Sequence, residues 1–336
     1  MTAAVHAGRS TSSRRAAWWW ARLAAAGATL AVLVWRLGTG PFLDGLLAVD
    51  GGALAAASGL AVLTTVCCAW RWRIVARGLG VDLPLDTAVA AYYRSLFLNV
   101  TLPGGVVGDV HRGISHGRDT NDVGRGLRAV AWERSAGQVV QVVLTVAVLL
   151  VLPSPVRAIA PLVALALLTA GAGVALAMRV PPAVGRSRWA RLRRAAARDL
   201  RDGLLAGRVW PAIALASAVV VAGHAVTFLI AARTAGATAP PSRMLPLALL
   251  VLLAAALPNV GGWGPREGVT AWAFAAAGLG ASLGVATAVV YGVMVFVASL
   301  PGAAVLVAAW VCRTRSAPWL PGRLGVLARY DGAQDA

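Results

Sequence analysis

Residues 102–112 read LPGGVVGDVHR, and residues 257–267 read LPNVGGWGPRE. In both stretches an apolar run is broken by proline and glycine, and the break leads directly into charged residues. The two prolines are about 155 residues apart, in corresponding positions of the two halves of the chain. Paired interruptions of this kind point to a transporter-type site near the bilayer midplane. The pair therefore predicts that the protein acts at the membrane and is not merely anchored there.

The composition defines the class of protein. The 336-residue chain is 59% hydrophobic and only 13% charged, and its mean hydropathy is +0.73. Its repeated apolar runs approach the ~20 residues that a membrane-spanning helix requires. Because these runs are continuous and do not alternate with a period of two, they exclude a β-barrel. We predict an all-α integral membrane protein that crosses the bilayer several times.

The hydropathy pattern predicts six full spans and two shorter dips into the membrane. The spans are expected at residues 17–36, 52–70, 128–152, 158–178, 210–232 and 284–312. Two further apolar stretches, 87–102 and 244–258, are about 15 residues long and reach about 23 Å, short of the ~30 Å hydrocarbon core. Since a break and a second partial helix follow each stretch, we expect two re-entrant hairpins. Paired short crossings are the alternative.

The arginines indicate the orientation of these spans. Lysine is absent, so all 31 residues of the Lys+Arg count are arginine. Most of them lie in the predicted inner segments, where the positive-inside rule places them. One such group, Arg71, Arg73 and Arg77, follows the second expected span, and a larger group lies between residues 179 and 208. Both termini are therefore expected in the cytoplasm.

This topology divides the chain into a membrane domain and two cytoplasmic tails. The tails are expected at residues 1–16 and 313–336, and the membrane domain between them at residues 17–312. Its halves, about 17–152 and 158–312, each contain three spans and one hairpin, so they have opposite orientations in the membrane. The pattern predicts an inverted repeat, an architecture that recurs in secondary transporters with the site at the repeat interface.

The net charge of +18 could suggest nucleic acid as a partner, but the distribution of charge favours lipid. The basic stretch 179–209 is typical of a segment that lies on the anionic inner leaflet. We therefore expect membrane lipids as partners and no nucleic acid. Cys67, Cys68 and Cys312 lack the spacing of a metal site or a disulfide framework, and we expect no metal and no cofactor.

Four ionisable residues next to the breaks are the first candidates for chemistry. They are Asp109, Arg112, Arg266 and Glu267. A charge at the bilayer centre costs roughly 2.5–3.5 kcal/mol, so these groups should pair or face water. If the breaks meet in a polar cavity, Arg112 and Arg266 could bind a phosphate, with the helix N-termini as further donors. Asp109 and Glu267 would hold those arginines or exchange protons. Alternatively, the two acid–arginine pairs only cap half-helices and neutralise each other.

The third expected span carries a polar stripe. Arg134, Gln138 and Gln141 recur on one helical face, and Glu133 precedes them. Such a stripe should face the bundle interior or a water-filled cavity, although Glu133 and Arg134 are close enough to the inner end to reach lipid headgroups instead. The expected substrate-binding residues are Asp109, Arg112, Glu133, Arg134, Gln138, Arg266 and Glu267. The expected break residues are Pro103, Gly104, Gly105, Gly108, Pro258, Gly261, Gly262 and Gly264.

His224 and Ser217 share one face of the fifth expected span. For this pair we expect hydrogen bonds between helices rather than a proton relay. Elsewhere the sequence contains no P-loop, GxSxG elbow, zinc motif or dinucleotide fingerprint. We therefore expect that the protein is not an enzyme.

The break motifs, together with Glu133-Arg134 at the start of a span, resemble the family built on the lysylphosphatidylglycerol synthase transmembrane region. Its members are often called flippase-like domain proteins, and the similarity covers about residues 17–312. The resemblance implies a plasma-membrane protein related to the module that moves aminoacylated phosphatidylglycerol between leaflets. The arginine-rich, alanine-rich composition suggests a bacterial source. In the full synthase a soluble domain follows, and since this chain stops at Ala336 we expect no lipid synthesis.

Three functions remain open at the level of sequence. The leading hypothesis is translocation of a phospholipid or a lipid-linked anionic headgroup through a polar cavity between the breaks. The second is a membrane glycosyltransferase that uses a polyprenyl-phosphate donor, with Asp109 or Glu267 as base. The third is a non-catalytic partner of a lipid-modifying enzyme. An enzyme should work in detergent, a translocator should require a sealed bilayer, and a scaffold should tolerate neutral residues in place of Arg112 and Arg266.

Overall fold

The computed structural model of the chain describes residue 24 and residues 27–158, 160–179, 194–204, 209–256, 259 and 263–316. The first half contains α2 (Gly40–Leu47), α3 (Gly51–Gly78), α4 (Leu85–Thr101), α5 (Val107–Asp119) and α6 (Val123–Val151). The second half contains α7 (Ala160–Arg179), a π-helical turn (Asp199–Leu204), α9 (Val209–Thr234), α10 (Pro241–Ala255), α11 (Pro265–Ala276) and α12 (Ala281–Ser316). The prediction of a helical membrane protein is confirmed.

Each half contains the same series of helices. In the first, a long helix (α3) is followed by two short ones (α4 and α5) and a second long one (α6). In the second, α9, α10, α11 and α12 repeat that series. Both predicted breaks separate the short helices: α4 ends at Thr101 and α5 begins at Val107, while α10 ends at Ala255 and α11 begins at Pro265.

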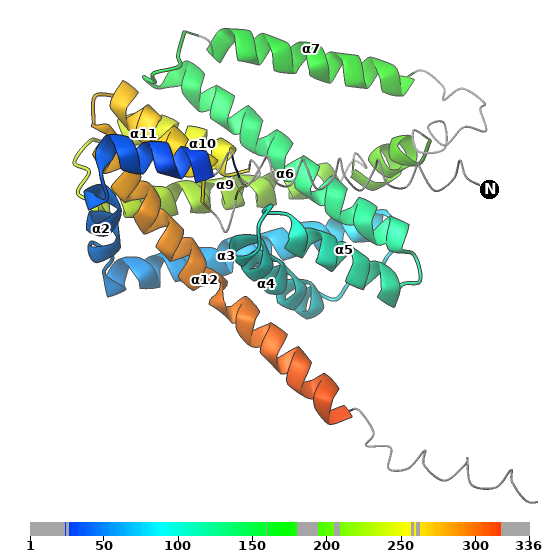
Figure 1. Cartoon of the computed structure of the whole chain (residues 1–336). Coiled ribbons are helices and arrows are strands. Elements are labelled where there is room, and N and C mark those ends of the chain that lie inside the picture. The colour runs from blue at the N-terminus through cyan, green and yellow to red at the C-terminus, as the bar shows by residue number, and fades with distance from the viewer. Residues whose placement is uncertain are drawn as a thin grey trace, which may run out of the picture.

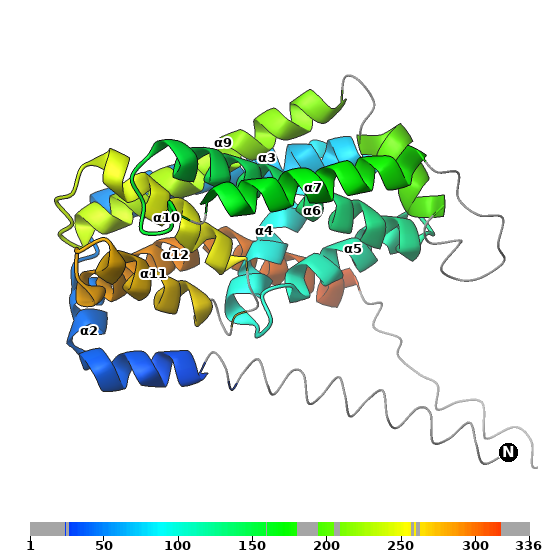
Figure 2. The same cartoon turned by 90° about the horizontal axis from the view of Figure 1, so that it is seen from above.

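The two series pack across each other. The long helices α3 and α9 lie against one another, α4 packs against α12, and α10 packs against α6. In addition α12 contacts α3, and α6 contacts α9. Figures 1 and 2 show the result as a single bundle in which the short helices of each half reach into the other half. This exchange brings the two breaks toward the middle of the bundle.

Among the described residues, four helices are long and apolar enough to cross a membrane, namely α3, α6, α9 and α12. They correspond to the spans expected at 52–70, 128–152, 210–232 and 284–312. The helix Gly27–Leu37 and α2 form a fifth candidate as a pair bent by 98°. Part of the first expected span, 17–36, lies outside the described residues. The span expected at 158–178 corresponds to α7, a helix of 20 residues.

The starts of these helices follow from local sequence. The Asp50 carboxylate accepts a hydrogen bond from the Ala53 N–H at 2.8 Å and caps α3, and Asp122 caps α6 through the Arg125 N–H at 2.8 Å. Pro241 and Pro265 occupy the first positions of α10 and α11, where the missing N–H costs no hydrogen bond. The breaks are thus encoded in the local sequence.

The helix α7 lies at the edge of the bundle. It packs against α6, and Figure 1 shows it beside that helix and apart from the rest of the bundle. Leu162, Leu165 and Leu168 on α7 are exposed, as are Val139 and Val143 on α6. A continuous apolar surface of this kind is expected where helices face lipid rather than water.

Candidate functional site

The first break is held together by one buried asparagine. The side-chain oxygen of Asn99 on α4 accepts a hydrogen bond from the backbone N–H of Gly108 at 2.8 Å, and its nitrogen donates to Asp109 at 2.9 Å. Ser95, one turn earlier, donates to the same carboxylate at 3.1 Å. Gly108 must be glycine, since a Cβ there would overlap the Ser95 carbonyl. These contacts lock α4 against α5 and fix Asp109 at their junction.

Glu133 on α6 is the centre of a buried network of charges. It has no exposed surface, and it accepts hydrogen bonds from Arg71 of α3 at 2.5 and 3.0 Å and from Arg112 of α5 at 3.1 Å. The Tyr92 hydroxyl donates to it at 3.3 Å. Arg112 also donates to Asp109 at 3.0 Å, and Arg134 forms an ion pair with Asp109. The network therefore joins four helices, and it places Glu133 in the interior rather than among headgroups.

Arg112 is enclosed between aromatic rings. Its guanidinium carbon lies 4.4 Å from the centroid of the Trp72 ring and 4.2 Å from that of Tyr92, and the residue is 1% exposed. Cation–π contacts of this kind stabilise a desolvated guanidinium whose remaining N–H groups lack acceptors. Arg112 is consequently a buried residue that holds Glu133 and Asp109 in place through hydrogen bonds.

Arg71 corrects a sequence-based expectation. It was expected in the inner loop after the second span, as one of the residues that orient the chain. Instead α3 continues to Gly78, and Arg71 is buried and donates to both Glu133 and the Ser217 hydroxyl, the latter at 2.9 Å. The predicted end of the span at residue 70 was wrong because a charge was assumed to mark the membrane edge. The buried Glu133, which requires cationic partners, was the signal that could have found Arg71.

The second break is organised by Glu267. The Gly264 N–H donates to its carboxylate at 2.7 Å, which caps α11, and Arg266 donates to its other oxygen at 2.9 and 2.5 Å. Gly264 has a φ of +129°, a conformation that favours glycine. The Arg266 guanidinium lies 5.5 Å from the Tyr291 ring and passes close to Gly292, where a Cβ would stand 2.7 Å from it. The capping role considered for Glu267 is thus confirmed.

The two breaks touch each other. The backbone N–H of Gly104 donates to the carbonyl of Asn259 at 2.8 Å. The next residue, Gly105, lies against the Asn259 side chain. Segments that are 155 residues apart in sequence therefore meet in space, as the hypothesis of a shared site requires.

A cavity of about 510 Å³ lies where the breaks meet. Asn99, Gly105 and Arg134 line it from the first half, and Asn259, Arg266 and Tyr291 line it from the second. Its described lining contains two guanidinium groups and no carboxylate. Both guanidiniums can donate hydrogen bonds to an acceptor placed in the cavity.

The predicted site residues divide into those that line the cavity and those that support it. Arg134 and Arg266 line the cavity. Asp109, Arg112, Glu133 and Glu267 are buried behind them, and Gln138 is half-buried and is not part of the described lining. Pro103, Gly104, Gly105, Gly108 and Gly264 lie at the breaks. Pro258, Gly261 and Gly262 lie outside the described residues.

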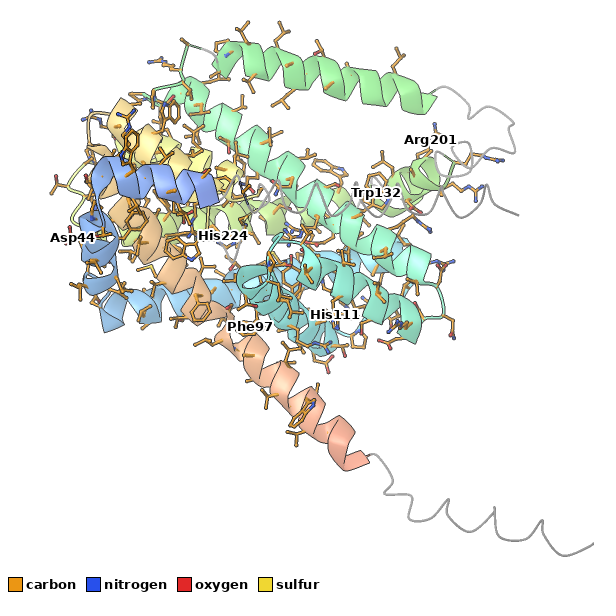
Figure 3. All side chains as sticks on the ribbon, viewed as in Figure 1. Asp44, Phe97, His111, Trp132, Arg201 and His224 are labelled. Atoms are coloured by element: carbon orange, nitrogen blue, oxygen red, sulfur yellow. The ribbon has the colours of Figure 1, made fainter. Side chains whose placement is uncertain are left out.

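Several site residues were not predicted. The contacts of Tyr92, Ser95, Asn99 and Asn259 with their partners depend on packing between helices, which leaves no local signal. The expectation of interhelical hydrogen bonds at His224 and Ser217 is confirmed: His224 pairs with the Tyr291 hydroxyl at 3.4 Å, and Ser217 with Arg71. Figure 3 shows His224 within the bundle, where it also lines the cavity.

The described turn before α9 (Asp199–Leu204) contacts the bundle through an acid and through Leu204, which packs with Val75 and Ile213. Asp199 accepts hydrogen bonds from Arg128 at 2.9 Å and from the Trp132 indole at 3.2 Å. Figure 3 shows Trp132 and Arg201 toward one end of the molecule and Asp44 at the other.

The fold and the site define a multi-pass helical membrane protein with a cation-lined cavity between two broken helix pairs. Residues 19–302 match the family described as the lysylphosphatidylglycerol synthase TM region. The match includes both breaks and most of the chain, so the protein belongs to this family. A search of curated proteins finds no match.

Proposed function

We propose that the protein translocates a phospholipid, or a lipid-linked molecule with an anionic headgroup, between the leaflets of a bacterial plasma membrane. The headgroup passes through the cavity while its tails remain in the bilayer. One observation carries this proposal. Arg134 of α6 and Arg266 of α11 belong to different halves of the chain, yet both line the cavity at the point where the breaks meet.

The proposed architecture is an inverted repeat with six spans, two re-entrant hairpins and cytoplasmic termini. It is supported by the exchange of packing partners: α4 of the first half lies on α12 of the second, and α10 of the second lies on α6 of the first. In transporters built from such repeats, substrate sites lie near the midplane at broken helices. Because the chain belongs to the lysylphosphatidylglycerol synthase TM region family, its family also supports a membrane protein related to lipid transport.

The carboxylates favour translocation over glycosyl transfer. Asp109 accepts hydrogen bonds or ion pairs from Ser95, Asn99, Arg112 and Arg134. Glu267 is fully buried and is engaged by Gly264 and Arg266. Because their oxygens already accept these hydrogen bonds, neither carboxylate is free to take a proton from an acceptor substrate, as the base of a glycosyltransferase must.

The proposal is tested by reconstituting the full chain in sealed liposomes that contain fluorescent phospholipids or fluorescent polyprenyl phosphates. Dithionite then quenches the lipids of the outer leaflet, with and without an imposed ion gradient. We expect faster leaflet exchange than in empty liposomes for at least one lipid. Arg134→Gln and Arg266→Gln should each slow that exchange about tenfold or more, because each removes a charge-assisted hydrogen bond worth roughly 1.5–3 kcal/mol.

The matched control is Arg77→Gln, which removes an exposed arginine whose partner is Asp82 on the surface. It should exchange lipids at the rate of the unmodified chain. If exchange equals that of empty liposomes for every lipid tried, the translocator proposal is wrong. Exchange at the unmodified rate in both cavity variants would show that the headgroup does not pass the two arginines.

A further inference from the structure

The electrostatic state of the cavity can be derived from its ion pairs. Behind Arg134 lies the network that contains Arg71, Arg112, Glu133 and Asp109. Three guanidiniums face two carboxylates there, which leaves one positive charge. Arg134 is the member of this network that lines the cavity, and it is also the most exposed, with a side chain 41% accessible against 8% or less for the others.

The opposite wall contributes no net charge. Arg266 is paired with Glu267 through two hydrogen bonds. The other oxygen of this carboxylate accepts the hydrogen bond that caps α11. The other side chains named in the described lining, such as Asn99, Asn259, Trp263 and Tyr291, are neutral. Across the described residues the cavity therefore presents two guanidiniums but only one uncompensated positive charge.

A buried charge without a partner is costly, because the surrounding protein screens it far less than water does. A ligand with one negative charge neutralises this cavity and can accept hydrogen bonds from both arginines. A ligand with two negative charges leaves one of them uncompensated. Neutral ligands leave the positive charge as it is.

We infer that the cavity selects a lipid phosphate with a single negative charge, that is a phosphodiester, over a phosphomonoester or a pyrophosphate. This inference rests on the proposed function, and it narrows the class of cargo. The phosphodiester chemistry is shared by glycerophospholipids and by glycosylated polyprenyl phosphates. Both classes have one negative charge on the phosphate, so their net phosphate charge does not distinguish them. Direct competition between lipids does.

The test measures lipid binding to the full chain by native mass spectrometry. Phosphatidylethanol and phosphatidic acid with identical acyl chains compete at equal concentration. The first is a diester with one charge at all pH values used, and the second is a monoester that loses its second proton near about pH 6. At about pH 5 we expect similar binding of the two, and at about pH 9 an excess of bound phosphatidylethanol of about tenfold.

The pH dependence of phosphatidylethanol binding is the internal control, because it reports any titration of the protein itself, including that of His224 in the lining. A parallel pair, a polyprenyl phosphate and its glucosyl diester, tests the second source of the same chemistry. A third competition, between phosphatidylethanol and the glucosyl diester, shows which of the two classes of diester binds more tightly.

A charge variant tests the same inference from the side of the protein. Asp109→Asn removes one carboxylate from the network and leaves two positive charges, so the preference at about pH 9 should shift toward phosphatidic acid by about tenfold. Asp82→Asn, on the surface, should leave the preference unchanged. Should Asp109→Asn fail to fold, the pH comparison on the unmodified chain decides the question.

Equal binding of phosphatidylethanol and phosphatidic acid at about pH 9 would overturn the inference while leaving the proposed function intact. The same holds for a folded Asp109→Asn chain whose preference does not change. Failure of every anionic lipid to bind would reject the proposed function itself.

Discussion

At the scale of single residues, Glu133 is the buried carboxylate that compensates the charge of two buried arginines. It is fully buried, and it sits between two guanidiniums and a phenol that come from three other helices. A buried ion pair contributes little net stability, yet breaking it is costly because the remaining charges lose their compensation. Arg71 and Arg112 would both be left in that condition if Glu133 became neutral.

Replacement of Glu133 is therefore predicted to destabilise the fold severely. Glu133→Gln should lower the free energy of unfolding by about 3–5 kcal/mol, since two buried guanidiniums lose a common counter-charge. The measurement is denaturant-induced unfolding of the detergent-solubilised chain. Asp82→Asn is the control: Arg77 hydrogen-bonds Asp82 and lowers the pKa of its carboxyl, but both side chains are exposed, so the stability should change little. Equal losses in the two variants would contradict the prediction.

At the scale of elements, the two breaks are stabilised by different hydrogen bonds. The α4–α5 pair depends on a side chain, Asn99, that bonds the first turn of α5. At the second break the cap lies within α11 itself, where Glu267 accepts from the Gly264 N–H. In both cases a side chain accepts a hydrogen bond from a backbone N–H that the break leaves free. Lipid offers no such acceptor.

The role of Asn99 gives the prediction at this scale. Asn99→Ala leaves the Gly108 N–H without a partner in the interior and removes one of the two donors to an Asp109 oxygen, at a cost of about 1–3 kcal/mol. We also expect faster hydrogen exchange in the first turn of α5. Thr101→Ala is the matched control, because Thr101 is exposed and bonds only the carbonyl of Phe97 in its own helix. Unchanged exchange at Gly108 in the Asn99 variant would show that the α4–α5 junction is held by other contacts.

At the scale of the whole molecule, one exposed residue at each end of the bundle can report its orientation in the membrane. Asp44 is exposed at one end, and Arg201 is exposed toward the other, near Trp132. In the proposed topology, with both termini in the cytoplasm, the positive-inside rule places Arg201 on the cytoplasmic side and Asp44 on the outer side.

This orientation is testable by labelling. In a chain whose Cys67, Cys68 and Cys312 are replaced by alanine, Asp44→Cys and Arg201→Cys should react with a membrane-impermeant maleimide from opposite sides of sealed vesicles. Addition of detergent should make both sites reactive, which controls for access. Reaction of both cysteines from the same side would contradict the proposed topology.

Sequence by itself determined the helices, the breaks and the set of charges near them. The lengths of apolar runs, and the effects of proline and glycine on the backbone, act over a few residues, so the bounds of α4 and α10 could be predicted to within three residues, while α5 and α11 were expected only as partial helices after the breaks. The meeting of the two breaks was also predicted, because charges in lipid require a shared polar environment. That requirement is general, and it does not say which side chain faces which.

Only the tertiary structure decided the roles of the arginines. Arg112 was expected to meet the ligand, but Trp72 and Tyr92 enclose it, while Arg134 lines the cavity. Arg71 was assigned to a loop and lies in the network. These roles depend on how each helix is rotated about its axis against its neighbours. That rotation is set by side-chain packing between segments far apart in the chain, which no local pattern records.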